Sequence, residues 1–268
     1  MPRARFLVSS ASQTTQPSRS KLWVELALVL LLSVGMSAIY AIVAFARRLS
    51  SPEPLSSQTA TLNRSLADQE IFDAIYQLLA VVSGLVPVAL VFFLVWAHQK
   101  PHLQAIGLTG GRIAGDFAWG VGLAALIGLP GLAVYAAGVR LGLTVQIVPS
   151  ALPDYWWAIP LLLLAALKAG LLEEVIAVGY LTHRLELLRI APWLIIASQA
   201  LLRGFYHLYQ GVGPFVGNIA MGVIFALFFL KTRRLAPLII AHALIDAVAF
   251  VGYPLVAESL PEILGFTG

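Results

Sequence analysis

The 268-residue sequence contains no cysteine, which excludes a disulfide framework, a thiolate metal site and a cysteine nucleophile. Charge is also scarce, because Asp, Glu, Lys and Arg make up only 11% of the residues, about half the share found in soluble domains. Hydrophobic residues make up 59%, and the mean hydropathy is +0.87. Several apolar stretches exceed about 18 residues, the length of a membrane span. The sequence therefore predicts a helical protein that crosses a membrane several times.

The formal net charge is +4 and the sequence pI is about 9.5, a balance that can indicate a nucleic-acid partner. Most Lys and Arg residues, however, flank the apolar stretches. Membrane topology explains this placement better, since positive residues collect beside the cytoplasmic ends of spans. We therefore expect membrane lipids as partners and no nucleic acid.

We predict an all-α transmembrane bundle of about seven spans with a cytoplasmic N-terminus, as the side of the membrane richer in Lys and Arg indicates. The predicted spans are 23–46, 71–97, 114–138, 155–181, 193–211, 214–230 and 235–254. The connecting segments between the first five spans are 47–70, 98–113, 139–154 and 182–192. The chain divides into a disordered basic tail, N-terminal transmembrane helices, a helical core and a C-terminal tail, at 1–21, 22–150, 151–254 and 255–268.

Ionisable residues occur inside the predicted spans of the helical core, where ordinary membrane helices carry none. Each Asp, Glu, Lys or Arg at the bilayer centre costs roughly 2.5–3.5 kcal/mol, so those present would together cost on the order of 15 kcal/mol facing lipid. Such residues persist when they face one another in a protein interior. A buried hydrolytic site is therefore the leading hypothesis. The residues are Lys168, Glu173, Glu174, Arg203, His207, His242 and Asp246.

Helical spacing places some of these side chains on common faces. His242 and Asp246 are four residues apart and share a face, as do Arg203 and His207. The two histidines can bind a divalent metal such as zinc or donate hydrogen bonds to a developing oxyanion. Lys168 is interpreted as a snorkelling or pairing residue without a catalytic role.

The adjacent glutamates, Glu173 and Glu174, point about 100° apart on a helix, so they are expected to have different roles. One can hold a water as general base, while the other pairs with a cation such as Arg203. At 1.5 Å per residue, these glutamates and the His242 pair lie about 10–17 Å deep, whereas His207 lies roughly 21 Å deep. His207 therefore fits the shared site less well.

Three segments of the core carry a resemblance to a known family: Glu173-Glu174-Val-Ile-Ala-Val178-Gly-Tyr-Leu, then Gly-Phe-Tyr-His207-Leu-Tyr-Gln-Gly, then His242-Ala-Leu-Ile-Asp246. They resemble the CPBP intramembrane proteases, which include CAAX prenyl proteases of the Ras-converting-enzyme type, lysostaphin-resistance proteins and abortive-infection-like proteins. The family pattern is EExxxR, FxxxH and HxxxN or HxxxD. The resemblance makes residues 151–254 a CPBP-like catalytic core.

The resemblance implies a role for each matched residue. Glu173 would activate the attacking water and Glu174 would support it. His207 and His242, together with Asp246, would stabilise the tetrahedral intermediate or hold a metal. The family has been described both as metalloproteases and as glutamic proteases, so a divalent metal and no cofactor are both consistent with the resemblance.

Two motif positions depart from the family pattern. Val178 stands where the family has Arg, and Arg203 stands where it has Phe. Each lies one helical turn from a residue of the cluster. We hypothesise that a guanidinium has moved from one helix to its neighbour while still neutralising the same carboxylate, with Arg203 in the supporting role.

The sequence-based interpretation is an integral-membrane endopeptidase that cuts a peptide or protein substrate, with or without a lipid modification, near the surface of a bacterial plasma membrane. The alternative is a catalytically degenerate scaffold or a bacteriocin-immunity-type protein of the same fold. A transporter ranks third, because transporters favour paired inverted halves, whereas the ionisable residues here are confined to one half.

Overall fold

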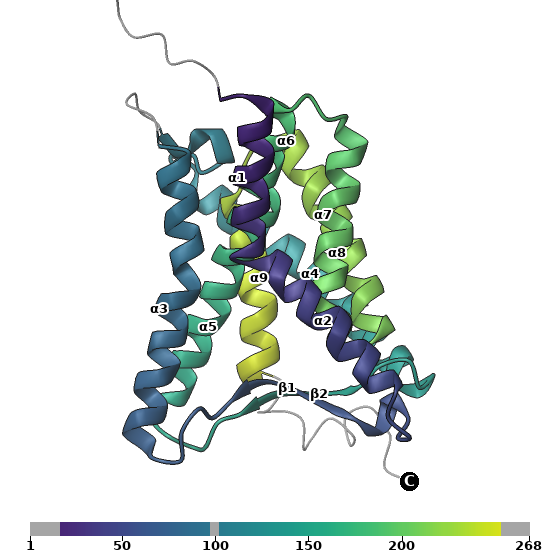
Figure 1. The fold of residues 1–268 in the computed structure, drawn as a ribbon. Helices are drawn as coiled ribbons and strands as arrows, with labels where there is room; N and C mark the ends of the chain where they lie inside the picture. Colours follow the sequence, from purple (N-terminus) through teal and green to yellow (C-terminus); the bar gives the residue numbers. More distant parts are fainter. Residues whose placement is uncertain (1–16, 97–101, 253–268) are drawn as a thin grey trace, which may run out of the picture.

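The computed structural model describes residues 17–96 and 102–252 and is mostly helical (Figure 1). The predicted C-terminal tail and most of the predicted N-terminal tail lie outside these residues. The α-helices of the described chain are α1 (Arg19–Leu31), α2 (Val34–Leu49), α3 (Glu70–Leu94), α4 (Ile113–Arg140), α5 (Ala158–Glu173), α6 (Leu181–Leu187), α7 (Pro192–His207), α8 (Val212–Thr232) and α9 (Ala236–Ala247). Shorter helical segments are η1 (Leu55–Ser57), η2 (His102–Ile106), η3 (Glu174–Tyr180), η4 (Leu208–Gln210) and η5 (Val248–Gly252).

The described residues contain three helices that are long and apolar enough to cross a membrane, namely α3, α4 and α8. The predicted first span, 23–46, is not one straight helix, because α1 and α2 meet at an angle of 55°. Near the break, the Ser33 hydroxyl donates to the carbonyl of Val29 at 2.6 Å, and such a bond competes with the helical ladder. Counting the bent pair as one span gives four. These helices make the chain an integral membrane protein, whereas the count of seven spans and the side of the N-terminus stay predictions.

A two-stranded parallel sheet closes the end of the bundle opposite the start of α1 (Figure 1). β1 (Thr59–Arg64) pairs with β2 (Gln146–Ala151) from Thr59 opposite Gln146 to Arg64 opposite Ala151. The Asn63 side chain also donates to the carbonyl of Pro149 at 2.8 Å. The prediction of an all-α fold, with 47–70 and 139–154 as plain connections, is therefore wrong at these two segments. β-Branched residues such as Thr61 and Val148 favour strands, and these two residues lie opposite each other in the sheet.

The backbone remains helical from α5 through η3 into α6, but η3 is a π-helix with wider turns. All seven residues of η3 are buried, and its apolar members belong to the core together with Phe229 and Leu238. An ion pair ties this segment to α1, since Arg184 Nη2 lies 2.7 Å from Glu25 Oε1, which also accepts from the Tyr180 hydroxyl at 2.7 Å. These contacts with α1 thus hold in place η3 and α6, the helical segments that follow Glu173.

We expect Gly170→Ala to weaken the contact between α5 and α9. A Cβ at Gly170 would lie 2.9 Å from the carbonyl oxygen of Ile239 and 3.2 Å from the amide nitrogen of Ala243. Both contacts are backbone atoms of α9, so α9 must shift, at a cost of about 1–3 kcal/mol. Thermal unfolding of the detergent-solubilised protein measures this loss.

Gly122→Ala is the matched control, because a Cβ at Gly122 would meet no atom within 4 Å. Alanine also has the higher helix propensity, so this variant should unfold at the wild-type temperature or slightly above. Equal unfolding temperatures for the two variants would contradict the close approach of α5 and α9.

Candidate active site

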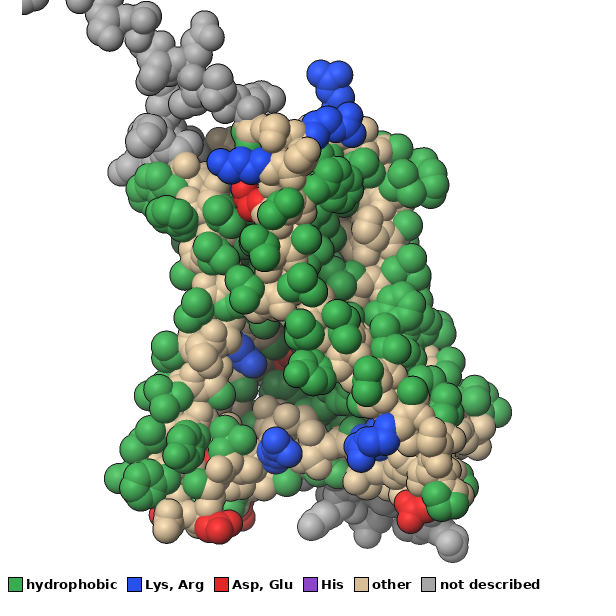
Figure 2. Space-filling model, viewed as in Figure 1, with side chains coloured by type: hydrophobic (Ala, Val, Ile, Leu, Met, Phe, Trp, Pro, Cys, Tyr) green, Lys and Arg blue, Asp and Glu red, His purple; other side chains and the backbone are tan. Residues whose placement is uncertain are grey.

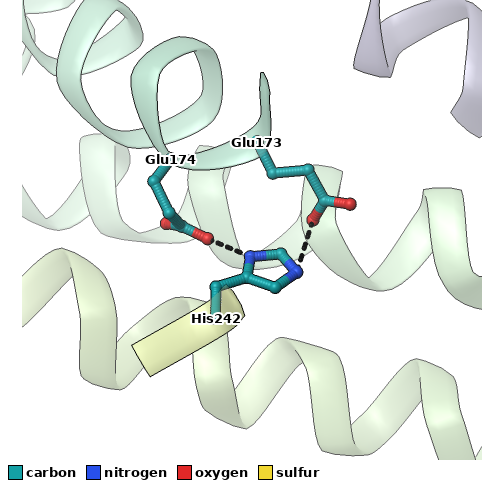
Figure 3. Close-up of side chains that lie close together, drawn as sticks. All are labelled: Glu173, Glu174 and His242. Atoms are coloured by element: carbon teal, nitrogen blue, oxygen red, sulfur yellow. Dashed lines mark hydrogen bonds and ion pairs between the residues drawn. The ribbon is translucent and has the colours of Figure 1, made fainter. Parts of the chain in front are cut away.

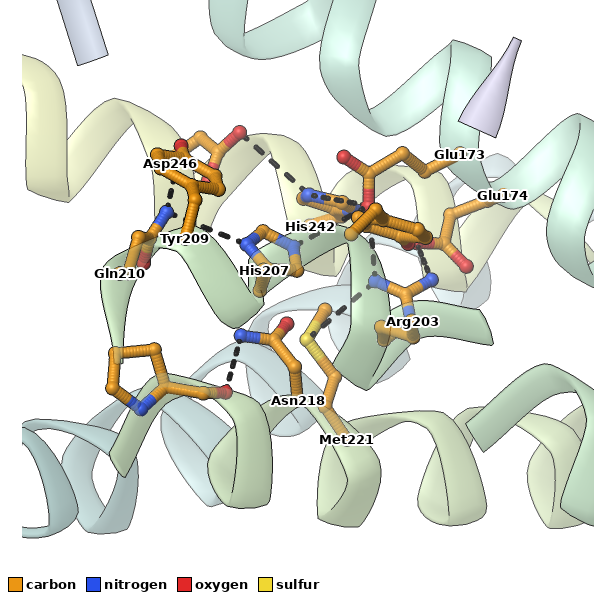
Figure 4. Close-up of polar contacts among 12 residues, drawn as sticks. Glu173, Glu174, Arg203, His207, Tyr209, Gln210, Asn218, Met221, His242 and Asp246 are labelled. Atoms are coloured by element: carbon orange, nitrogen blue, oxygen red, sulfur yellow. Dashed lines mark hydrogen bonds and ion pairs between the residues drawn. The ribbon is translucent and has the colours of Figure 1, made fainter. Parts of the chain in front are cut away.

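The ionisable residues of the core converge from three helices at one place in the bundle (Figure 4). Glu173 ends α5 and Glu174 begins η3, while Arg203 and His207 lie in the last two turns of α7. α9 supplies His242 and Asp246 on one face. After η4 the chain turns at Gly211, whose φ of 106° is strained for any other residue type, and this turn ends α7 close to His207.

Glu174 is the fully buried member, with a side-chain exposure of 0%. Its Oε1 accepts from Arg203 Nη2 at 2.5 Å and lies 2.6 Å from His242 Nδ1 (Figure 3). The guanidinium is itself 1% exposed and lies over the ring of Phe225, with its central carbon 5.3 Å from the ring centroid. A buried carboxylate needs such a partner, because an uncompensated charge in a low-dielectric interior is costly. Arg203 and Glu174 therefore act as one neutral unit that also orients His242.

Glu173 is more accessible, with a side-chain exposure of 15%. One oxygen, Oε2, accepts from the Tyr206 hydroxyl at 2.6 Å and from Arg203 Nη1 at 3.4 Å. The same oxygen lies 3.8 Å from His242 Nε2 and 3.9 Å from His207 Nε2. The other oxygen points away from His242 (Figure 3). Glu173 is thus fixed through one oxygen while the second stays available.

His207 lies close to Glu173 despite the greater depth predicted for it. Its Nε2 is buried and has no hydrogen-bond partner among the described residues, while its Nδ1 lies 3.5 Å from Gln210 Nε2. At the other end of the cluster, Asp246 Oδ2 lies 3.6 Å from His242 Nε2. The structure therefore brings together all the residues proposed from the sequence except Lys168, which lies on another face of α5, toward α3.

The sequence interpretation missed Tyr206. Its hydroxyl makes one of the shortest contacts with Glu173, and its ring lies 4.8 Å from that of His207, centroid to centroid. A signal was present, because Tyr206 is three residues after Arg203 and so shares its helical face. An uncharged tyrosine in an apolar span carries no large insertion cost, so insertion cost does not identify it as a site residue.

The potential metal ligands in the described chain differ from the two histidines expected. Glu173, Glu174 and His242 offer ligand atoms within 4.8 Å of one another, whereas His207 is not part of this group. Three protein ligands suffice in number for a catalytic zinc site. However, Arg203 already contacts both carboxylates, and His242 Nδ1 is engaged with Glu174. A metal would compete with this guanidinium for the carboxylates, so the donor set suits a metal poorly.

Comparison with known protein families bears on the part of the chain that holds this site. Residues 155–248 match the type II CAAX prenyl endopeptidase family, Rce1-like. The predicted resemblance is thereby confirmed over the segment from the start of α5 to the end of α9. This Rce1-like segment contains the two glutamates, Arg203, both histidines and Asp246. No curated protein and no solved structure matched the chain.

The match to the Rce1-like family indicates a membrane endopeptidase. Inside the Rce1-like segment, Val178 is buried among apolar residues of η3, and Arg203 reaches both glutamates from the neighbouring helix. The guanidinium therefore lies at the glutamate pair even though the residue at position 178 is apolar.

Proposed function

We propose that this protein is an integral-membrane endopeptidase in which Glu173 activates a water molecule for attack on a peptide carbonyl. The observation that carries the proposal is the asymmetry of the two glutamates. Glu174 is fully buried and neutralised by Arg203, whereas Glu173 is partly exposed, is held through Oε2 and has its second oxygen directed away. Acid–base work requires one accessible carboxylate with fixed geometry, and Glu173 meets both conditions.

In this mechanism Glu173 accepts a proton from water while the water oxygen attacks the scissile carbonyl carbon. The carbonyl becomes an oxyanion, which needs hydrogen-bond donors placed before the reaction. His207 Nε2 suits this role, because it is buried, lies 3.9 Å from Glu173 Oε2 and has no hydrogen-bond partner among the described residues. Glu173 then passes the proton to the leaving amine, the carbon–nitrogen bond breaks, and the carboxylate is restored.

The remaining residues position these groups. Tyr206 and Arg203 hold Glu173 Oε2, and Glu174 orients the His242 ring. Asp246 lies beside the same ring, 3.6 Å from Nε2. A bound divalent metal would polarise the carbonyl and the water, but Arg203 stands at the carboxylates that would have to hold it. We therefore assign no step to a metal and expect glutamate-driven hydrolysis.

A peptide-library assay tests the function directly. The wild-type protein, solubilised in a neutral detergent, should cleave a subset of peptides, whereas Glu173→Ala should cleave none of them. A chelator such as EDTA should leave wild-type turnover unchanged. Loss of turnover on chelation, with recovery on adding zinc, would instead assign the chemistry to a metal. We propose a peptide or protein substrate, with or without a lipid modification, at the bacterial plasma membrane.

A further inference from the structure

A second polar region lies apart from the glutamate site, in a cleft of about 210 Å³ between β1, α3 and α5. Its charged lining residues are Arg64 and Lys168, and no Asp or Glu lines it. Asn63 and Gln77 add amide groups, and the rest of the lining is apolar. The volume is below the roughly 300–1,000 Å³ of pockets for drug-sized ligands. The cleft therefore suits one end group or one side chain of a larger molecule, and that group should be anionic.

Lys168 is the charge whose presence in this cleft needs an explanation. It lies on α5, inside the predicted span 155–181, and its aliphatic stem passes close to α3, since a Cβ at Gly84 would lie 2.8 Å from Lys168 Cδ. The salt bridges among the described residues do not include Lys168, which is half-buried. A lysine at this depth is costly to insert and is by default a candidate functional residue.

The cleft and the glutamate site share one helix. Lys168 and Glu173 both lie on α5, five residues apart, which is about 7.5 Å along the helix axis at about 1.5 Å per residue. Figure 2 shows a hollow in this face of the molecule, with basic and acidic side chains inside it, above the end closed by the sheet. A molecule whose end group binds at Lys168 would therefore be able to extend as far as Glu173.

We propose that this cleft binds a carboxylate of the peptide substrate, so that Lys168 and Arg64 select acidic peptides and set the position of the scissile bond. The inference rests on the proposed endopeptidase function. Charge complementarity and the apolar lining identify the occupant as a carboxylate on an apolar peptide. The carboxylate comes from an acidic side chain or from the C-terminus, and both sources present the same chemistry to Lys168. The small volume favours a peptide group over the acyl chains of a lipid.

Binding to the Glu173→Gln protein tests the cleft without depending on turnover. The probes are fluorescein-labelled apolar peptides in two matched pairs: free against amidated C-terminus, and an internal Glu against Gln. One carboxylate member should bind about tenfold more tightly than its neutral partner, as expected of a charge-assisted contact. Lys168→Met should abolish this preference, and Lys168→Arg should retain most of it. Arg47→Gln is the control, because Arg47 is an exposed cation near the same end and does not line the cleft.

The pair that shows the preference identifies the source of the carboxylate. Equal affinities within both pairs, or an unchanged preference in Lys168→Met, would overturn the proposal. Competition by phosphatidylglycerol with no peptide preference would overturn it as well and assign the cleft to a lipid. A lysine-dependent preference in a protein that cleaves no peptide would retain the cleft and refute the endopeptidase. Cleavage without any carboxylate preference would retain the endopeptidase and refute the proposed role of the cleft.

Discussion

Glu173→Gln should reduce peptide cleavage by at least about 10²–10⁴-fold, the contribution typical of a positioned general base. The amide keeps the shape of the side chain and can still accept the hydroxyl of Tyr206, which lies 2.6 Å from Oε2. It cannot accept a proton from water at neutral pH. The loss should therefore appear in kcat rather than in KM, as measured by initial rates on a peptide from the library screen.

Two comparisons separate this loss from a folding defect. The variant should elute from size-exclusion chromatography in detergent like the wild type and should unfold at a similar temperature. Glu53→Gln removes an exposed carboxylate outside the site and should cleave at the wild-type rate. Turnover of Glu173→Gln near the wild-type level would show that Glu173 is not the base, and Glu174 or a non-proteolytic function would take its place.

Arg203→Phe should cost both stability and activity. The guanidinium is the cation that neutralises the fully buried Glu174, and removing one partner of a buried ion pair costs about 3–5 kcal/mol. Glu174 would be left with His242 Nδ1 on the same oxygen, and Glu173 Oε2 would lose its contact with Nη1. We expect a lower unfolding temperature and a loss of cleavage of at least about 100-fold, corresponding to about 2.7 kcal/mol in transition-state stabilisation.

Combining Arg203→Phe with Val178→Arg should recover much of this loss, to within about tenfold of the wild-type rate. Position 178 lies four residues beyond Glu174 in η3, and Val178 is buried, so an arginine there would need a carboxylate partner inside the same core. Val178→Arg alone should be harmful, since it adds a second guanidinium to the same core. A gain of the double variant over both single variants is a coupling that additive effects cannot produce.

The outcome distinguishes two histories of the site. Recovery in the double variant would support a guanidinium that has changed helices while serving the same carboxylate. A double variant no better than Arg203→Phe would show that Arg203 is not equivalent to a residue at position 178. The degenerate, non-catalytic interpretation would then become the better account of this chain.

The sequence predicted the long apolar helices well, because hydrophobic length alone defines them. The predicted spans 71–97, 114–138 and 214–230 correspond to α3, α4 and α8 to within a few residues. The break between α1 and α2 could not be predicted in this way, because residues 31–35 contain no proline and remain mostly apolar. At the 55° bend the Ser33 hydroxyl donates to the carbonyl of Val29, a contact that hydrophobic length does not reveal.

The clustering of the ionisable residues was predictable from their insertion cost, but the details of their contacts were not. The depth assigned to His207 assumed straight helices along the membrane normal, whereas the helices in Figure 1 cross at various angles. In the structure His207 Nε2 lies 3.9 Å from Glu173 Oε2. Glu174 also begins the π-helical turns of η3, which no hydrophobic pattern reveals.

The parallel sheet at the closed end imposes an order on how the molecule is made. Asn63 and Pro149, which the sheet brings together, are 86 positions apart in the chain, and α3 and α4 lie between them. β1 therefore leaves the ribosome long before its partner strand exists, and pairing must wait until both intervening helices have entered the membrane. Contacts so distant in sequence form slowly. The lining of the cleft, to which β1 contributes Arg64, is thus completed late in biogenesis. By then the helix α3, which also lines the cleft, is already in place.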